Sequence, residues 1–299
     1  MKILITGLNG FIGKSLKNLL SEKYQVLSLV RDKNNNNKYN NNKYNNIFNI
    51  IGDLSNPDEW GEKVVNFAPD YCIHMAWEGL PDYSPEKCKT NLNQNLLFLD
   101  FLCKVKVPNI ILTGSCYEYG DYDGRLEENL SPQNPSIFGL TKIAIFDYFE
   151  SLCKANELNF KWARIFFSYG PNQRNVSLIP SIWKNLKLNK KNSIKTPFLS
   201  NDFIYVDDVA NGILNLLDNK SPSGIYNIGS GKLTSVGYIA NLIHSYYKKD
   251  LPYPDIDTIN LKGFYSDNRK IENLTSWEPK ISIEDGVIKT LKYLDKKYG

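Results

Sequence analysis

Three glycines spaced three residues apart follow the first apolar run of this chain and constrain its fold more than any other feature. Lys2 to Thr6 is typical of a short buried strand, and Gly7, Gly10 and Gly13 come directly after it, at the start of a helical pattern. In such a turn the first glycine permits a tight bend, the second lets the backbone approach a pyrophosphate, and the third lets helix and strand pack closely. Free N–H groups at the start of the helix hold the anion. We therefore expect a dinucleotide to bind at Gly7, Asn9, Gly10, Phe11, Ile12 and Gly13, with a purely structural turn as the alternative.

Apolar runs alternate with helical patterns through the first half of the chain. We expect strands at residues 2–6, 26–30, 47–51, 71–75, 109–113 and 159–166, and helices at about 56–67, 85–104 and 136–155. This alternation predicts an α/β fold, a Rossmann-type doubly wound parallel sheet with a smaller C-terminal substrate-binding lobe. We expect residues 1–168 to form the NAD(P)-binding domain and 169–299 the substrate lobe, with segments near 201–228 packing back on the sheet.

Composition excludes several kinds of partner. The chain has 36 Lys plus Arg against 32 Asp plus Glu, a net charge of +4 and only five Arg, which argues against nucleic-acid binding. No apolar run approaches about 18 residues, so we expect neither a membrane span nor a signal peptide. Five widely spaced cysteines predict a cytoplasmic protein without a disulfide framework or a metal site. The Asn-rich segment 33–46 is interpreted as an enlarged polar loop.

The ends of the second and third strands indicate which dinucleotide binds. Arg31 stands where an acidic residue would bind an unsubstituted ribose 2′-OH, and its guanidinium can pair with a 2′-phosphate. Arg31 therefore favours NADP, with NAD as the alternative if Arg31 is only a surface residue beside Asp32. Asp53 and Leu54, just after the third strand, are placed to meet the adenine.

A series of short motifs runs in order along the chain. Besides the glycine triplet it comprises Gly52-Asp53-Leu54, His74-Met75-Ala76, Thr113-Gly114-Ser115 with Tyr119-Gly120, Phe138-x-x-x-Lys142, Tyr169-Gly170-Pro171 and Phe203 to Asp208. Together these motifs resemble the extended short-chain dehydrogenase/reductase family, in its NAD-dependent epimerase/dehydratase branch. Trp77 to Pro81 and Thr113 to Gly120 are similar to segments of dTDP-4-keto-6-deoxyhexose reductases of the dTDP-fucose synthase type. The resemblance implies a nucleotide-diphosphate sugar as substrate, cofactor contacts at Ala76 and Thr113, and a homodimer through the helices near residues 86–104 and 136–155.

The resemblance also implies which residues act on the sugar. In this family a Ser or Thr, a Tyr, and a Lys four residues after the Tyr work together on a sugar C–O bond, and here these positions are Ser115, Phe138 and Lys142. Residues i and i+4 share one face of a helix, so Lys142 lies beside position 138, where an ammonium lowers the pKa of a phenol and can hold the nicotinamide ribose. Phe138 has no proton to exchange. Three explanations stay open: an engineered Tyr→Phe change, a natural variant that uses another acid such as Tyr117, or a cofactor-binding regulator without turnover.

The residues next to Ser115 and the two histidines argue against two reactions of the family. Dehydratases of the branch carry Asp and Glu where this chain has Cys116 and Tyr117, and the two histidines, His74 and His244, are poorly placed for base-driven epimerisation. This leaves hydride transfer alone. Arg31 favours NADPH-dependent reduction of the C4 keto group of a dTDP-, GDP- or CDP-linked 4-keto-6-deoxy sugar, in the synthesis of surface-polysaccharide sugars. An NAD-dependent C4 epimerase is the alternative, because it also works by hydride transfer.

Several aromatic and basic residues are candidates for substrate binding. Trp77, Tyr117 and Phe167 are expected to shape the sugar pocket, with Ser115 holding the reacting oxygen. Arg174 and Arg269 are the expected partners of the pyrophosphate in a chain so poor in Arg, unless they are only surface cations.

Overall fold

The architecture is that of a computed structural model, which describes residues 1–20, 23–31, 46–192, 194–217, 221–253, 256 and 261–299. Two sequence interpretations, the Asn-rich loop at 33–45 and the place of Asp32 beside Arg31, fall outside the described residues. Contacts divide the chain into two compact units. Unit 1 comprises Met1–Asp121, Ser131–Arg164 and Ile213–Tyr226, and unit 2 comprises Tyr122–Leu130, Ile165–Gly212 and Asn227–Gly299.

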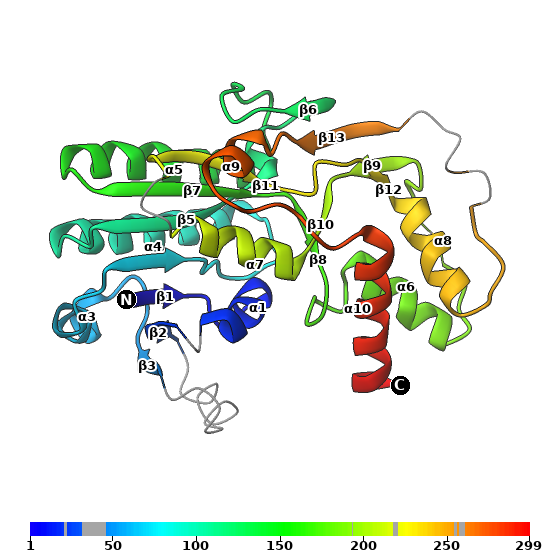
Figure 1. The fold of residues 1–299 in the computed structure, drawn as a ribbon, viewed down its shortest axis with the longest axis horizontal. Helices are drawn as coiled ribbons and strands as arrows, with labels where there is room; N and C mark the ends of the chain where they lie inside the picture. Colours follow the sequence, from blue (N-terminus) through cyan, green and yellow to red (C-terminus); the bar gives the residue numbers. More distant parts are fainter. Residues whose placement is uncertain (21–22, 32–45, 193, 218–220, 254–255, 257–260) are drawn as a thin grey trace. The chain divides into compact units, whose positions relative to one another are not determined.

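A seven-stranded sheet organises unit 1 (Figure 1). Its strands are β1 (Lys2–Thr6), β2 (Gln25–Val30), β3 (Ile47–Ile51), β4 (Tyr71–His74), β5 (Asn109–Ser115), β7 (Asn159–Ile165) and β11 (Gly224–Ile228). Their order is β11-β7-β5-β4-β1-β2-β3, and β1 pairs in parallel with both β2 and β4. The predicted α/β, Rossmann-type sheet is therefore confirmed. The strand order reverses at β1, and ligands of such sheets bind at that switch point, beyond the carboxyl ends of the strands.

The helices of unit 1 cover the sheet. They are α1 (Phe11–Leu20), α3 (Gly61–Phe67), α4 (Pro85–Lys104) and α5 (Ile137–Ala155), with 3₁₀ turns η1 (Pro57–Glu59) and η2 (Cys116–Glu118); α7 (Val206–Asn215) runs from unit 2 into unit 1. Right-handed crossovers place α1 and α4 on opposite faces, because the chain leaves β1 in one direction and β4 in the other. Helices α4 and α5 lie side by side (Figure 1).

One predicted element differs from the structure. Instead of a single helix at 56–67, the chain forms η1 and α3, with Trp60 between them. The Trp60 indole N–H donates to the carbonyl of Asp53 at 2.7 Å, and its ring packs against Phe98 and Phe101 of α4. These tertiary contacts interrupt the helix, and the local helical pattern does not reveal them.

Unit 2 combines small sheets with three longer helices. Strands β12 (Thr234–Ser235), β9 (Leu199–Asn201), β13 (Lys262–Ser266) and β6 (Gly124–Leu126) form one sheet in that order, and β10 (Phe203–Tyr205) pairs with β8 (Phe167–Tyr169). The longer helices are α6 (Leu178–Lys187), α8 (Val236–Tyr246) and α10 (Ile283–Tyr298), and α9 (Arg269–Leu274) is short. Apolar side chains of α6, α8 and α10 pack together around Trp183, Ile239 and Leu291. That residues 1–168 bind the cofactor and residues 169–299 bind the substrate stays a prediction.

Helices α4 and α5 keep part of their apolar surface exposed. Phe98 and Phe149 are buried in the core of unit 1, whereas Leu97 and Leu140 are exposed. The homodimer expected through these helices stays a prediction, which light scattering tests. In the described part of the chain, no helix has the length and apolar character to cross a bilayer.

Candidate active site

The glycine turn after β1 has the geometry of a phosphate-binding loop. The Gly10 N–H donates to the carbonyl of Gly7 at 2.9 Å, and Gly7 has a φ of +76°. A Cβ at Gly7 would lie 2.8 Å from the carbonyl carbon of Met75, and one at Gly13 would lie 2.3 Å from the carbonyl oxygen of Gly7. Gly10 is exposed, and the first N–H groups of α1 have no acceptor within the helix. The turn therefore fits a dinucleotide pyrophosphate, which Asn9, Gly10, Phe11, Ile12 and Gly13 would hold.

We expect Gly13→Ala to lower the free energy of unfolding by about 2–3 kcal/mol, because the new methyl group forces α1 away from β1. Urea unfolding followed by circular dichroism measures this. Gly10→Ala is the matched control, because its Cβ meets only the Gly7 carbonyl oxygen, at 3.0 Å. A Gly13→Ala protein as stable as the wild type would contradict the close packing of helix and strand.

Asp53 and Leu54 lie just beyond β3, as predicted for the adenine end of the site. Asp53 Oδ1 accepts hydrogen bonds from the hydroxyl and the backbone N–H of Ser55, and the hydroxyl bond lowers the pKa of the Asp53 carboxyl. Leu54 is buried. Asp53 therefore presents a charged, partly exposed carboxylate there, and its contact with adenine stays a prediction.

Arg31 is engaged by a residue that the sequence analysis did not assign to the site. Its Nη1 lies 2.7 Å from Oε2 of Glu78, in the segment that follows β4. Glu78 Oε1 also lies 2.9 Å from Nζ of Lys87. The guanidinium predicted to attract a 2′-phosphate is thus already paired with a carboxylate.

A buried hydrogen-bond chain fixes the segment after β4. His74 Nδ1 lies 2.6 Å from Thr6 Oγ1, and its Nε2 lies 2.9 Å from Asn95 Oδ1. Burial lowers the pKa of His74 to about 4, so the imidazole is neutral at physiological pH. Thr6 Oγ1 also accepts the N–H of Ala76, at 3.2 Å. His74 therefore positions Ala76 beside the glycine turn, and both of its ring nitrogens are engaged by Thr6 and Asn95.

Ser115 ends β5 and is fixed there by Glu118. The Ser115 N–H donates to Glu118 Oε1 at 2.6 Å, and the Ser115 hydroxyl accepts from the N–H of Tyr117, which together form a capping box. Glu118 is 1% exposed, and its carboxylate accepts from Trp162 Nε1 and, at 2.8 Å, from Arg164 Nε. The sequence analysis missed Glu118, although Ser115-x-x-Glu118 has the spacing of a capping box. Glu118 is a positioning residue, because its carboxylate is held by Ser115, Trp162 and Arg164.

We expect Glu118→Gln to lower the free energy of unfolding by about 3 kcal/mol, because Arg164 keeps a buried charge without its counterion. Chemical denaturation measures the change. Glu150→Gln is the matched control: its ion pair with Lys154 is largely exposed, so we expect a change below about 0.5 kcal/mol. Equal effects of the two variants would show that burial of the Glu118 pair is not what matters.

Lys142 projects from α5 to the end of β5. Its Nζ donates to the carbonyl of Thr113 at 2.9 Å and lies 4.4 Å from the ring centre of Trp77. The residue is 7% exposed, and burial lowers the pKa of Lys142 to about 8, against the opposing effect of Glu118. Lys142 is therefore still mostly charged at pH 7 and lies near Ser115, two residues beyond Thr113.

Phe138 is surrounded by aromatic rings. Its ring centre lies 5.0 Å from that of Trp77, 4.8 Å from that of Tyr83 and 5.9 Å from that of Tyr117, each in an edge arrangement. Phe138 is 8% exposed, whereas Tyr83 and Tyr117 are exposed. The buried Trp77 Nε1 has no hydrogen-bond partner among the described residues. Unit 1 thus brings Ser115, Trp77, Tyr117, Phe138 and Lys142 together; Tyr83 was missed, because no motif includes it.

Unit 2 holds the other predicted substrate contacts. Phe167 is half-buried in β8, beside Phe203 and Phe264, and Arg174 is exposed. Arg269 is paired with Asp267 and Glu127, with Nη2 lying 2.5 Å and 3.1 Å from their carboxylate oxygens. The charge of Arg269 is therefore already compensated within unit 2, unlike what we expect of a dedicated pyrophosphate ligand. The contacts of Phe167, Arg174 and Arg269 with the substrate stay predictions.

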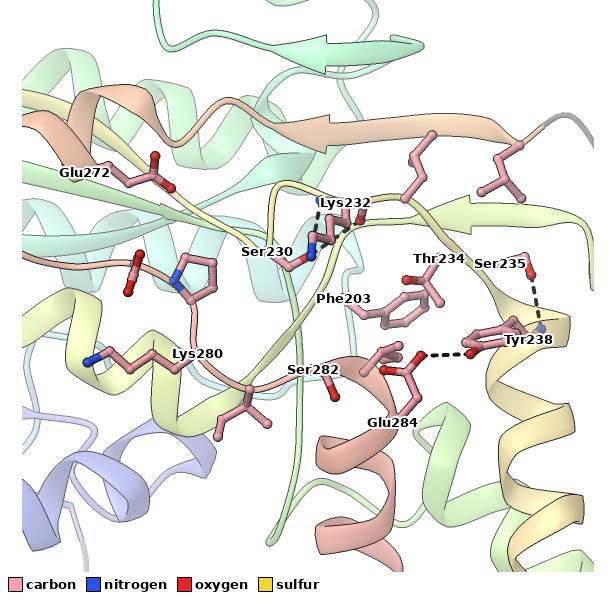
Figure 2. Close-up of a pocket in the computed structure, with 16 residues that line it drawn as sticks. Phe203, Ser230, Lys232, Thr234, Ser235, Tyr238, Glu272, Lys280, Ser282 and Glu284 are labelled. Atoms are coloured by element: carbon pink, nitrogen blue, oxygen red, sulfur yellow. Dashed lines mark hydrogen bonds between the residues drawn. The ribbon is translucent and has the colours of Figure 1, made fainter. Parts of the chain in front are cut away.

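A separate cavity of about 670 Å³ lies within unit 2 (Figure 2). Its walls include Phe203, Lys232, Tyr238 and Glu284, and the Tyr238 hydroxyl donates to Glu284 Oε1 at 2.8 Å. None of the residues predicted to bind cofactor or sugar lines it. The candidate active site of unit 1 is therefore a different place.

Comparison with known proteins places this geometry in context. Residues 3–229 match the model of the NAD dependent epimerase/dehydratase family. The chain is 26% identical to dTDP-6-deoxy-L-talose 4-dehydrogenase (NAD(+)) of Aggregatibacter actinomycetemcomitans, over 79% of this chain and 87% of that protein.

Solved structures of similar fold carry NAD. UDP-glucuronic acid 4-epimerase from Bacillus cereus, in complex with NAD, superimposes with a TM-score of 0.85, at 23% identity and with 100% of each chain covered. The dTDP-glucose 4,6-dehydratase of Bacillus anthracis, also with NAD, gives a TM-score of 0.83 at 21% identity, covering 100% of this chain and 97% of that one. At these identities the likeness concerns the fold.

Proposed function

The chain belongs to the NAD dependent epimerase/dehydratase family, and from this premise we propose that it transfers hydride between NAD(H) and C4 of a nucleotide-linked 6-deoxyhexose. The observation that carries the proposal is the placement of Lys142 against the Thr113 carbonyl, at 2.9 Å, beside Ser115. These groups act on a sugar oxygen. The positions next to Ser115 hold Cys116 and Tyr117, and Glu118 is committed to Arg164, so a carboxylate pair for dehydration is missing from this loop.

The cofactor we propose is NAD rather than NADP. The similar proteins named above are an NAD(+) dehydrogenase and enzymes in complex with NAD. In this chain Arg31, the basis for expecting NADP, is paired with Glu78. Bound at the glycine turn, the nicotinamide would supply or accept the hydride.

The side chains of the site then hold the oxygen on C4 and move its proton. In the reducing direction, Ser115 donates a hydrogen bond to the carbonyl oxygen, and the Lys142 ammonium stabilises the negative charge that develops there. Because Phe138 has no proton to give, we assign that step to Tyr117. Partial burial raises the pKa of Tyr117 to about 12, so it holds its proton at neutral pH and is a competent donor to an alkoxide.

The test is to assay the purified chain with NADH and dTDP-, GDP- and CDP-linked 4-keto-6-deoxy sugars, following absorbance at 340 nm and the product by chromatography. Stoichiometric NADH oxidation with formation of a 4-hydroxy sugar supports the proposal. Failure of every sugar, with the coenzyme still bound, would overturn the reductase and leave the C4 epimerase described below or a cofactor-binding regulator.

A C4 epimerase is the second candidate, and the similarity to a UDP-glucuronic acid 4-epimerase favours it. The same Ser115 and Lys142 serve both reactions, because an epimerase oxidises C4 and reduces it again. The two differ in the fate of the coenzyme: an epimerase interconverts C4 isomers of a nucleotide sugar without net change in NADH, whereas a reductase consumes NADH.

A further inference from the structure

Arg31 and Glu78 meet at the carboxyl ends of the strands, where the glycine turn begins. Arg31 directly follows β2, and Glu78 comes four residues after β4. Strand β1 lies between β2 and β4 and ends at Thr6, just before Gly7. The ion pair, with Nη1 and Oε2 2.7 Å apart, therefore spans the carboxyl end of β1, beside the turn that fits the dinucleotide phosphates.

Glu78 is held in place by its neighbours on α4. The side chain of Asn91, itself buried, accepts the N–H of Glu78 at 2.7 Å and donates to its carbonyl at 3.0 Å. The Glu78 carboxylate also accepts from Lys87 Nζ, at 2.9 Å, and from Gln94. Hydrogen bonding from Lys87 contributes most to lowering the pKa of the Glu78 carboxyl, so the group is charged at neutral pH. Its side chain is 26% exposed, so the carboxylate, although paired with Arg31 and Lys87, is within reach of a hydroxyl donor.

We propose that Glu78 is the cofactor-selecting residue of this chain, the carboxylate that accepts a hydroxyl of the adenine ribose and rejects a 2′-phosphate. A ribose hydroxyl can donate to a carboxylate, whereas a phosphate brings like charge against it. Glu78 also neutralises Arg31, the cation that would otherwise attract the phosphate. In this chain a basic residue stands at the end of β2, and the acidic group comes from the segment after β4. The inference rests on the coenzyme site of the proposed function and adds which residue selects the coenzyme.

The test measures the affinities of NADH and NADPH by isothermal titration calorimetry on the full chain. We expect the wild type to bind NADH more tightly than NADPH. Glu78→Gln keeps the size of the side chain, and Asn91 still holds its backbone. We expect this variant to bind NADPH about tenfold more tightly and NADH several-fold more weakly, because Arg31 is released. Adding Arg31→Gln to Glu78→Gln should abolish the gain in NADPH affinity.

Glu62→Gln on α3 is the matched control: it removes an exposed carboxylate of the same unit, and we expect no change in the ratio of the two affinities. Thermal unfolding of each variant verifies that it is folded, and Glu78→Asp replaces Glu78→Gln if the latter is not, with a smaller shift toward NADPH expected. A wild type that binds NADH selectively, with an unchanged ratio in Glu78→Gln, would overturn the role of Glu78 and leave the proposed function standing. A wild type that prefers NADPH would also overturn it, whereas binding of neither coenzyme would overturn the proposed function itself.

Discussion

Phe138→Tyr should raise the turnover of a nucleotide-linked 4-keto sugar with NADH by a factor of about 100 or more. General acid catalysis by a positioned side chain contributes roughly 10²- to 10⁴-fold, and position 138 lies one helical turn from Lys142 on α5. The ammonium of Lys142 would lower the pKa of the new phenol, whereas the pKa of Tyr117 is raised to about 12. Initial rates at saturating sugar measure the effect.

Two further variants separate the proton donors. Tyr117→Phe should abolish most turnover of the wild type and leave most of the turnover of Phe138→Tyr, because the new phenol then supplies the proton. Phe146→Tyr is the matched control: it adds a hydroxyl to a half-buried ring on the same helix, beside Trp162, and should leave turnover unchanged. If neither the wild type nor Phe138→Tyr turns over any sugar tested, the chain is better explained as a coenzyme-binding regulator. Turnover by the wild type with no gain in Phe138→Tyr would contradict proton donation from position 138.

Lys142→Met should lower turnover about 100-fold or more and at the same time stabilise the fold. The ammonium has one hydrogen bond to Thr113 and contacts the Trp77 ring, but it is buried, and desolvation lowers its pKa to about 8. Methionine has a similar length and no charge to desolvate. At pH 7 we expect Lys142→Met to be more stable than the wild type by about 1–3 kcal/mol.

The pH dependence of stability gives an independent measurement. The folded-state pKa of Lys142, about 8, lies below the ordinary value of 10.5, so between these values the unfolded chain binds more protons than the folded one. The contribution of Lys142 to the free energy of unfolding therefore increases as pH rises from about 8 to 10.5. This increase should be absent from Lys142→Met. Lys161→Met is the matched control, because Lys161 is also buried and donates to a backbone carbonyl, yet lies near the start of β7; it should retain turnover.

The sequence predicts the elements whose signals are local. The helix at 85–104 is found with the predicted bounds, because Ser84 caps it and Pro85 occupies its first turn. The glycine turn was predicted from its place at a strand end, whereas Ser115 and Lys142 were predicted from the resemblance to the family, and their roles stay predictions. Residues that act across the fold were not identified. Glu78 reaches Arg31 across β1, Tyr83 reaches Phe138 from the loop before α4, and Trp60 breaks a helix by bonding to Asp53. Such contacts depend on strand order, which no single segment encodes.

Unit 1 is assembled from three separate stretches of the chain, and this has a consequence for biosynthesis. Strand β11, which pairs with β7, is reached only at Gly224, after much of unit 2 has been made. A nascent or truncated chain that stops at residue 168 leaves the outer edge of β7 unpaired, and open sheet edges promote aggregation. We therefore expect the first 168 residues expressed alone to precipitate. During synthesis, we expect the sheet to be completed only after residue 228 has left the ribosome.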